Sequence, residues 1–153
     1  MTNTLADELR TTVDAALLRL LAIAPPRDAR HPAPGKWSPR EIVGHLIDSA
    51  WNNHTRFVLA QDERAPEIHF TGYAQDDWVA RQRYADRPWP ELVALWHAVN
   101  HHVAHGLAAM PPNAHDRLCR HPDRTAPLRW FVADYLAHLR HHLQQVFAIA
   151  AQP

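Results

Sequence analysis

The stretch Trp37-Ser-Pro-Arg-Glu-Ile-Val-Gly-His-Leu-Ile-Asp-Ser-Ala50 opens with a helix start signal and continues in a helical pattern. Ser38 suits the N-cap position, Pro39 the first helical position and Glu41 the third, which is the arrangement of a capping box. In that arrangement the serine and glutamate side chains accept hydrogen bonds from backbone amides that have no partner inside the helix. The stretch therefore predicts a helix from residue 39 to about residue 61.

Prolines divide the rest of the chain into further helical blocks. Apolar residues recur at helical spacing in three long blocks and one short one, which are residues 5–22, 90–110, 126–151 and 74–84. Thr125 is predicted to cap the last helix, and residues 113–124 give a weak signal for a short hairpin. Four long amphipathic helices, one short one and no convincing strand pattern predict an all-α fold, a four-helix bundle with one short extra helix.

The composition excludes several classes of protein. A chain of 153 residues predicts a single domain over residues 1–153. Lys plus Arg and Asp plus Glu each number 16, so no basic surface for nucleic acid is expected. The single Cys119 excludes an internal disulfide and a multi-cysteine zinc site. No apolar run approaches the about 20 residues of a membrane span, and residues 1–8 do not resemble a signal peptide, so we expect a cytoplasmic protein without a membrane partner.

The thirteen histidines are the most unusual feature of the composition. With a rotation of about 100° per helical residue, each histidine can be placed on a helix face. A polar stripe runs beside the apolar stripe of the helix that starts at residue 39, and its members are His45, Ser49, Asn52 and Arg56. This stripe fits either a polar edge of the bundle or the lining of a cavity.

His138 and His142 lie on the flank of the apolar stripe in the last predicted helix. They are one helical turn apart, so their rings can converge on one metal ion. The pair also fits two buried histidines that have hydrogen-bond partners. With a third histidine from another helix, we favour the metal site.

A second set of histidines competes with this interpretation. His97, His101 and His105 form a row at intervals of four residues in the helix predicted over residues 90–110. The apolar stripe of that helix lies on the opposite side, so the row is predicted to face solvent. A tuned metal site needs carboxylate partners and a dry cavity, which the row is not expected to have. A solvated surface is therefore the favoured interpretation, although an oligomer interface could cover it.

Three segments carry a family pattern. Residues 35–48 contain Trp-Ser-x-x-Glu-x-x-x-His-Leu-x-Asp, residues 73–79 read Tyr-Ala-Gln-Asp-Asp-Trp-Val, and residues 135–145 contain His-x-x-His-His-x-x-Gln. In this order and spacing they resemble the DinB-like superfamily, over about residues 35–148. The resemblance implies an up-down-down-up connection of the four helices and a homodimer. It also implies a divalent metal held by three histidines, which are His45, His138 and His142.

Three neutral imidazoles leave open positions on Zn²⁺ or Ni²⁺, with Fe²⁺ or Mn²⁺ as alternatives. Such an ion acidifies water or binds a thiol as thiolate. The resemblance implies a metal-dependent hydrolase or a transferase that uses a low-molecular-weight thiol, acting on a small molecule. The alternatives are a non-catalytic bundle that binds metal or a small molecule, and a structural dimer whose three histidines hold no metal.

Five other residues are candidates for supporting roles. Ser49, Asn52 and Arg56 could line the same pocket, with Arg56 holding a carboxylate or another anion. Asp48 or Asp134 could orient a ligand histidine.

Overall fold

Helix α2 (Pro39–Leu59) begins as the sequence predicts. The Ser38 side chain accepts a hydrogen bond from the Glu41 amide, and the Glu41 carboxylate accepts one of 2.8 Å from the Ser38 amide. This confirms the capping box, which fixes the first turn of the helix.

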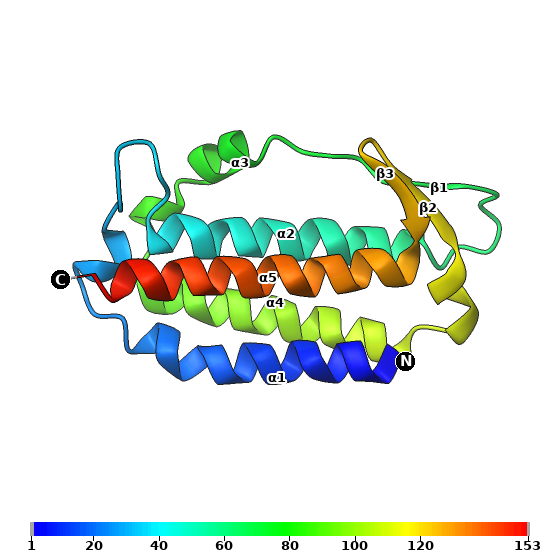
Figure 1. Cartoon of the computed structure of the whole chain (residues 1–153), viewed down its shortest axis with the longest axis horizontal. Coiled ribbons are helices and arrows are strands. Elements are labelled where there is room, and N and C mark those ends of the chain that lie inside the picture. Colours follow the sequence, from blue (N-terminus) through cyan, green and yellow to red (C-terminus); the bar gives the residue numbers. More distant parts are fainter. Residues whose placement is uncertain (1, 153) are drawn as a thin grey trace.

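The computed structural model describes residues 2–152, with side chains from residue 4 onward. Its long helices are α1 (Thr2–Leu21), α2, α4 (Trp89–Ala109) and α5 (Leu128–Ala150). Helices α1 and α5 run in one direction and α2 and α4 in the other, as Figure 1 shows. This confirms the predicted up-down-down-up bundle. The short helix α3 (Gln75–Gln82) lies outside the bundle, over α2 (Figure 1).

Short 3-10 helices and strands complete the described part of the chain. The 3-10 helices are η1 (Arg27–Ala29), η2 (Tyr84–Asp86) and η3 (Pro112–Asp116). The strands are β1 (Ile68–His69), β2 (Leu118–His121) and β3 (Arg124–Pro127). They form a sheet of order β1-β2-β3, in which β2 pairs antiparallel with β3 and parallel with β1. The weak hairpin signal is thus real, but the hairpin extends to Pro127.

The prediction that Thr125 caps the last helix is wrong. Thr125 lies in β3, opposite Arg120, and α5 begins only at Leu128. The N-cap of α5 is Pro127, which makes no side-chain cap. The sheet itself was not expected because β1 pairs with β2 across a long sequence separation, with Ile68 opposite Cys119. A local pattern carries no information about such a pairing.

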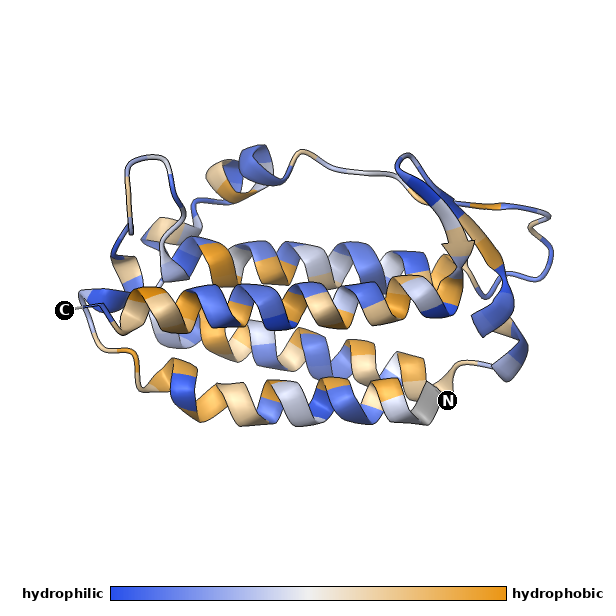
Figure 2. Ribbon diagram, viewed as in Figure 1, coloured by the Kyte–Doolittle hydropathy of each residue, from blue (hydrophilic) through white to orange (hydrophobic). Residues whose placement is uncertain are grey.

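Apolar side chains from all four long helices fill the bundle core, and Figure 2 shows apolar and polar residues alternating around each helix. The largest fully buried side chains include Trp96, Leu9, Leu20, Leu46, Ile47, Leu92, Leu128 and Leu139. Two buried polar contacts tie helices together. The Trp89 indole donates a 2.8 Å hydrogen bond to the Leu20 carbonyl, and the Tyr135 hydroxyl donates one of 2.5 Å to Asn100. None of the helices within residues 2–152 combines the length and hydropathy that crossing a membrane requires.

Two of the hydrogen bonds between the long α2–α4 connection and α2 converge on one buried carboxylate. The Tyr84 hydroxyl and the Gln82 amide donate to the same oxygen of the buried Asp48 carboxylate, over 2.7 and 2.5 Å. The Tyr84 ring lies directly on Gly44, where a Cβ atom would overlap the ring carbons. Gly44 therefore leaves space for Tyr84, whose hydroxyl holds the connection between α2 and α4 against α2.

Candidate metal centre

Three histidine side chains converge between two antiparallel neighbours, α2 and α5. His45 comes from α2 and is fully buried, while His138 and His142 come from successive turns of α5 and are partly buried. The Nε2 atoms of His45 and His138 are 3.1 Å apart. The ring centroids are 4.5 to 5.0 Å from one another, and one ligand atom from each ring lies within 4.8 Å of the other two.

The protonation state of the three rings suits metal binding. Burial, with the neighbouring histidines, lowers the pKa of His45 to about 3 and that of His138 to about 4. Burial also lowers the pKa of His142, although the hydrogen bond to Gln145 opposes the shift. All three imidazoles are therefore neutral at pH 7, which is the form that coordinates a metal.

The donor set also fits a metal ion. Two neutral imidazole nitrogens that face each other can share only one proton, whereas an ion accepts a lone pair from each. The Nδ1 atom of His45 is buried and has no hydrogen-bond partner among the described residues. Packing holds this ring instead, with the Trp37 ring centroid 4.9 Å from that of His45.

Gln145 orients His142 and has no assigned role in the sequence analysis. The Nδ1–H of His142 donates a 2.8 Å hydrogen bond to Gln145 Oε1, which leaves the Nε2 lone pair free for an ion. The Gln145 amide in turn donates to His141 over 3.0 Å. The contact could have been expected from the sequence, because residues three apart in a helix lie on the same face.

Replacing Gln145 by leucine removes the acceptor that fixes the His142 ring. We expect the zinc affinity of the untagged protein to fall about 10- to 100-fold, as is usual when a partner of a ligand histidine is lost. A zinc titration of the metal-free protein measures this. Gln144→Leu is the matched control, because its exposed side chain lies one position away and makes none of these contacts. Equal affinities in the two variants would contradict the orienting role.

A cavity of about 260 Å³ lies beside the three histidines, with His138 in its wall. Three of the predicted pocket residues, Ser49, Arg56 and Asp134, also line it. The other lining residues, for which the sequence analysis has no role, are Asn53, Gly72, Tyr73, Gln75, His121, Asp123, Phe131 and Tyr135. Asn53 lies on α2, and the others come from the connection between α2 and α4, from the hairpin and from α5. Their assembly therefore depends on contacts that helix periodicity does not predict.

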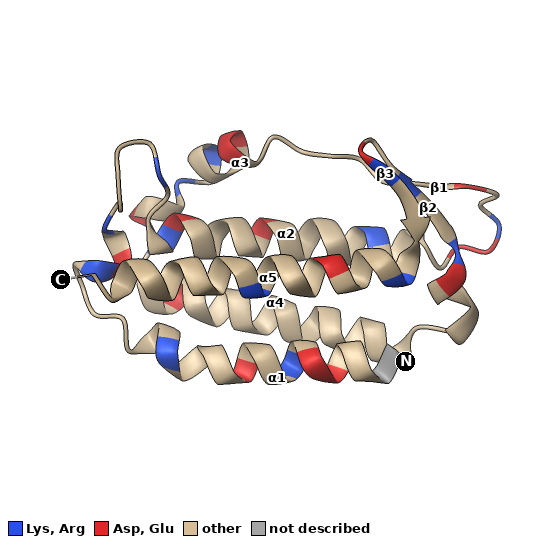
Figure 3. Ribbon diagram, viewed as in Figure 1, with Lys and Arg blue, Asp and Glu red and all other residues tan. Residues whose placement is uncertain are grey.

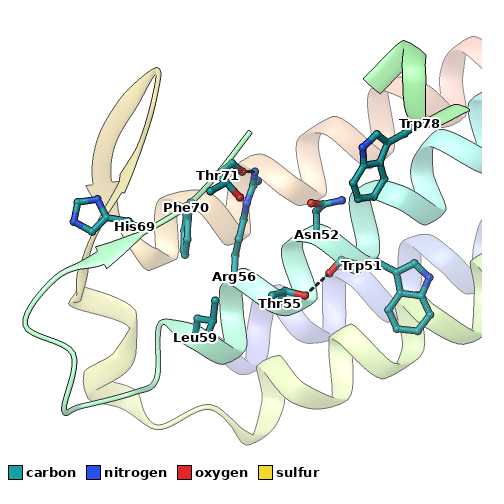
Figure 4. A pocket seen from close by; sticks show the side chains of 9 residues that line it. All are labelled: Trp51, Asn52, Thr55, Arg56, Leu59, His69, Phe70, Thr71 and Trp78. Carbon is teal, nitrogen blue, oxygen red and sulfur yellow. Dashed lines mark hydrogen bonds between the residues drawn. The ribbon is translucent and has the colours of Figure 1, made fainter. Parts of the chain in front are cut away.

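Arg56 lines both this cavity and a smaller one of about 190 Å³. Figure 4 shows its side chain rising from α2 beside Phe70, toward Thr71. One guanidinium nitrogen donates to the Thr71 carbonyl over 2.5 Å, and the guanidinium carbon is 5.7 Å from the Phe70 ring centroid. Burial lowers the pKa of Arg56, but a guanidinium keeps its charge at neutral pH. The wall of the larger cavity therefore carries a fixed cation.

The remaining predicted residues lie apart from the histidine ligands. Asn52 lines the smaller cavity, and its amide donates to the Asp48 backbone carbonyl over 2.9 Å. The Asp48 carboxylate is engaged by Tyr84 and Gln82. Asp134 is exposed on the cavity wall. Neither carboxylate has a hydrogen bond to a histidine within the described part of the chain.

The competing row of histidines differs from its prediction. His105 is exposed, as expected, but His97 and His101 are only partly exposed and both bond to Asp14 of α1. The expectation that the row lacks a carboxylate is therefore wrong. Helix periodicity places the row away from the apolar stripe but does not say what the neighbouring helix presents there.

Comparisons with known proteins agree with the fold. Residues 9–146 match the model of the DinB superfamily. A "putative metal-dependent hydrolase" of Bacillus mycoides (strain KBAB4) is 25% identical over 116 residues, which are 75% of this chain and 65% of that protein. One of Oceanobacillus iheyensis is 26% identical over 116 residues, which are 75% of this chain and 66% of that protein. The chain thus spans just under two thirds of the length of these relatives.

A solved structure extends the likeness over nearly the whole chain. YfiT from Bacillus subtilis, described as a probable metal-dependent hydrolase with an unusual four-helix bundle topology, superposes with a TM-score of 0.83. The match covers 97% of this chain and 85% of YfiT at 22% sequence identity. At this identity the likeness concerns the fold.

Proposed function

Since this chain belongs to the DinB superfamily, we propose that it is a metal-dependent hydrolase that acts on a small molecule. The observation that carries the proposal is the convergence of three neutral imidazoles within 4.8 Å of one another, one of which, His138, lines a cavity. The names of the curated relatives and of YfiT point to the same class of reaction.

In this proposal His45, His138 and His142 hold the ion. When bound, a divalent ion supplies Lewis acidity and lowers the pKa of a coordinated water. Arg56 binds an anionic group of the substrate in the cavity, because its charge is fixed there by the Thr71 carbonyl and the Phe70 ring. The rings of Phe131 and Tyr135, which also line the cavity, help to exclude water from it.

Protons are held by two titratable side chains of the same cavity wall. Asp134 projects from α5, and His121 comes from the β2–β3 hairpin. A carboxylate and an imidazole in one cavity can accept a proton from the attacking group and return it to the leaving group. We assign these two residues the proton transfers.

The donor set indicates which metal ion binds, and the family resemblance indicates the oligomeric state. Three neutral imidazoles suit Zn²⁺ or Ni²⁺, with Fe²⁺ or Mn²⁺ as alternatives, and metal analysis of the untagged protein identifies the ion. We propose a homodimer from the resemblance alone, and light scattering of the same preparation measures its mass. The cytoplasmic location expected from the sequence is still a prediction. Ser49 belongs to the cavity wall in this proposal, whereas Asn52 lines the smaller cavity and Asp48 accepts hydrogen bonds from Tyr84 and Gln82.

The test is turnover of small esters and amides by the untagged, zinc-loaded protein, in matched pairs with and without a carboxylate group. We expect hydrolysis that is lost on chelation, returns with zinc, and falls at least about 100-fold in His142→Ala. Arg56→Leu should lower kcat/KM about 10-fold or more for the anionic member of each pair and far less for the neutral member. His105→Ala, on the far side of the bundle, is the control and should leave turnover unchanged.

Two outcomes would overturn the hydrolase. Product formation only with an added low-molecular-weight thiol, which is consumed with the electrophile, would make the protein a thiol transferase. Bound metal without turnover of any substrate, with or without thiol, would make it a non-catalytic metal-binding bundle.

A further inference from the structure

A second group of metal-ligating side chains lies between α1 and α4. Asp14 of α1 accepts hydrogen bonds at one carboxylate oxygen, Oδ1, from the Nε2 atoms of His97 and His101, over 3.0 and 2.7 Å. The two rings are one helical turn apart, and their centroids are 4.4 Å from each other. The three ligand atoms lie within 4.8 Å of one another, as in the first cluster, but they involve the other pair of helices.

The position of this cluster follows from the packing of α1 against α4. Each member of the cluster directly follows a buried residue in the sequence. These preceding residues are Val13, Trp96 and Asn100, and they are almost inaccessible to solvent. The three side chains therefore lie at the edge of the contact between α1 and α4, two helices that run side by side (Figure 1). Their side chains are 57%, 28% and 36% exposed for Asp14, His97 and His101, so an ion can enter from solvent.

The nearby basic residue Arg10 does not compete with the histidines for the Asp14 carboxylate. Helix α4 contains no Lys or Arg and a single acidic residue, Glu91, as Figure 3 shows. Arg10, one turn before Asp14, donates instead to Asp7 and to the Ala104 carbonyl. The hydrogen bonds from His101 and His97 lower the pKa of Asp14, so the carboxylate is ionised at neutral pH.

We propose that Asp14, His97 and His101 form a second metal site, for a divalent ion of the zinc, nickel and copper class. Two imidazoles and one carboxylate are a donor set that these ions accept, whereas Ca²⁺ and Mg²⁺ require oxygen ligands. Ligand bonds of about 2.0–2.1 Å in a tetrahedral site place the ligand atoms about 3.3 Å apart. The observed 3.0 and 2.7 Å thus need to open only slightly when an ion takes the place of the two Nε2 protons, since each neutral ring then carries its proton on Nδ1.

The site does not depend on the proposed hydrolase activity. It uses none of the residues of the first cluster, and none of its three side chains lines the cavity beside that cluster. Its ion would join α1 to α4, two helices that are far apart in the sequence. We therefore expect binding at this site to be read in stoichiometry and in thermal stability, without turnover.

Zinc titration of the untagged, metal-free protein tests the proposal. We expect two ions per chain in the wild type and one in His97→Ala/His101→Ala, with the helical circular dichroism unchanged. Asp14→Asn should weaken the second site about 10-fold or more while leaving the first intact. His105→Ala is the matched control, since it belongs to the same row but lies outside the cluster, and it should still bind two ions.

A second readout separates this site from the first. A His45→Ala/His142→Ala protein, which keeps Asp14, should still bind one zinc ion per chain and show a zinc-dependent rise in Tm. Adding Asp14→Asn to this protein should remove that rise. One ion per chain in the wild type, or a second ion that persists without His97 and His101, would overturn the proposal. So would a second ion that is lost equally in His105→Ala, because it would then belong to the exposed row and not to Asp14.

Discussion

Removal of the His45 imidazole should abolish tight metal binding at the α2–α5 centre. We expect the zinc dissociation constant of His45→Ala to rise at least about 1000-fold, more than the 10- to 100-fold that follows loss of a ligand's partner. The reason is that two ligands from one helix remain, and His45 is fully buried, so water does not replace it at the same position. Zinc competition against a chromogenic chelator measures the constant.

Zinc binding by His97 and His101 would obscure the effect of His45→Ala. The titration is made in a chain that also carries His97→Ala and His101→Ala, so that the centre between α2 and α5 is measured alone. His54→Ala is the control on the same helix, because His54 contacts His102 and Trp51 and lies outside both clusters. A zinc constant in His45→Ala within a few fold of the control would refute the three-histidine site.

A single methyl group at Gly44 should be among the most destabilising changes in the chain. The added Cβ of Gly44→Ala would overlap the Tyr84 ring, so Tyr84 must move and lose its buried hydrogen bond to Asp48. Overpacking and the loss of one of the two hydrogen bonds to the buried Asp48 carboxylate together cost about 3 kcal/mol of unfolding free energy. For a chain of this size that corresponds to a fall in Tm of about 6–12 °C.

Gly106→Ala is a matched control for this experiment. Gly106 also lies inside a long helix, α4, but a Cβ atom there would have nothing within 4 Å. Alanine should therefore raise the unfolding free energy by about 0.4–1 kcal/mol, through helix propensity and a smaller loss of backbone entropy. Thermal and urea unfolding of the metal-free variants measures both changes. A Gly44→Ala protein as stable as Gly106→Ala would contradict the contact with Tyr84.

Most of the fold could be predicted from helix-start signals and from the helical spacing of apolar residues. Ser38 and Glu41 start α2 because a capping box needs only neighbouring residues, and prolines mark where the other helices end. The convergence of His45, His138 and His142 could be expected because each lies beside an apolar stripe, and such stripes meet in the core. Their role as metal ligands is still a prediction.

Features that depend on which segments meet could not be predicted in this way. Cys119 pairs with Ile68 in the sheet, and neither two-residue β1 nor the exposed Leu118 shows a strand pattern. The contact of His97 and His101 with Asp14 arises because α1 packs against α4 and presents Asp14 beside the two histidines. Helix periodicity gives the direction of a side chain but not the identity of its neighbour.

The up-down-down-up topology has a consequence for the order of folding. Helix α1 packs chiefly on α4 and α5, not on α2, which follows it in the chain. Its partners are therefore the helices that are synthesised last, and loop closure over most of the chain precedes its docking. Contacts at such sequence separation slow folding relative to a bundle of consecutive helices. The apolar face of α1 consequently stays uncovered until α4 and α5 have been synthesised.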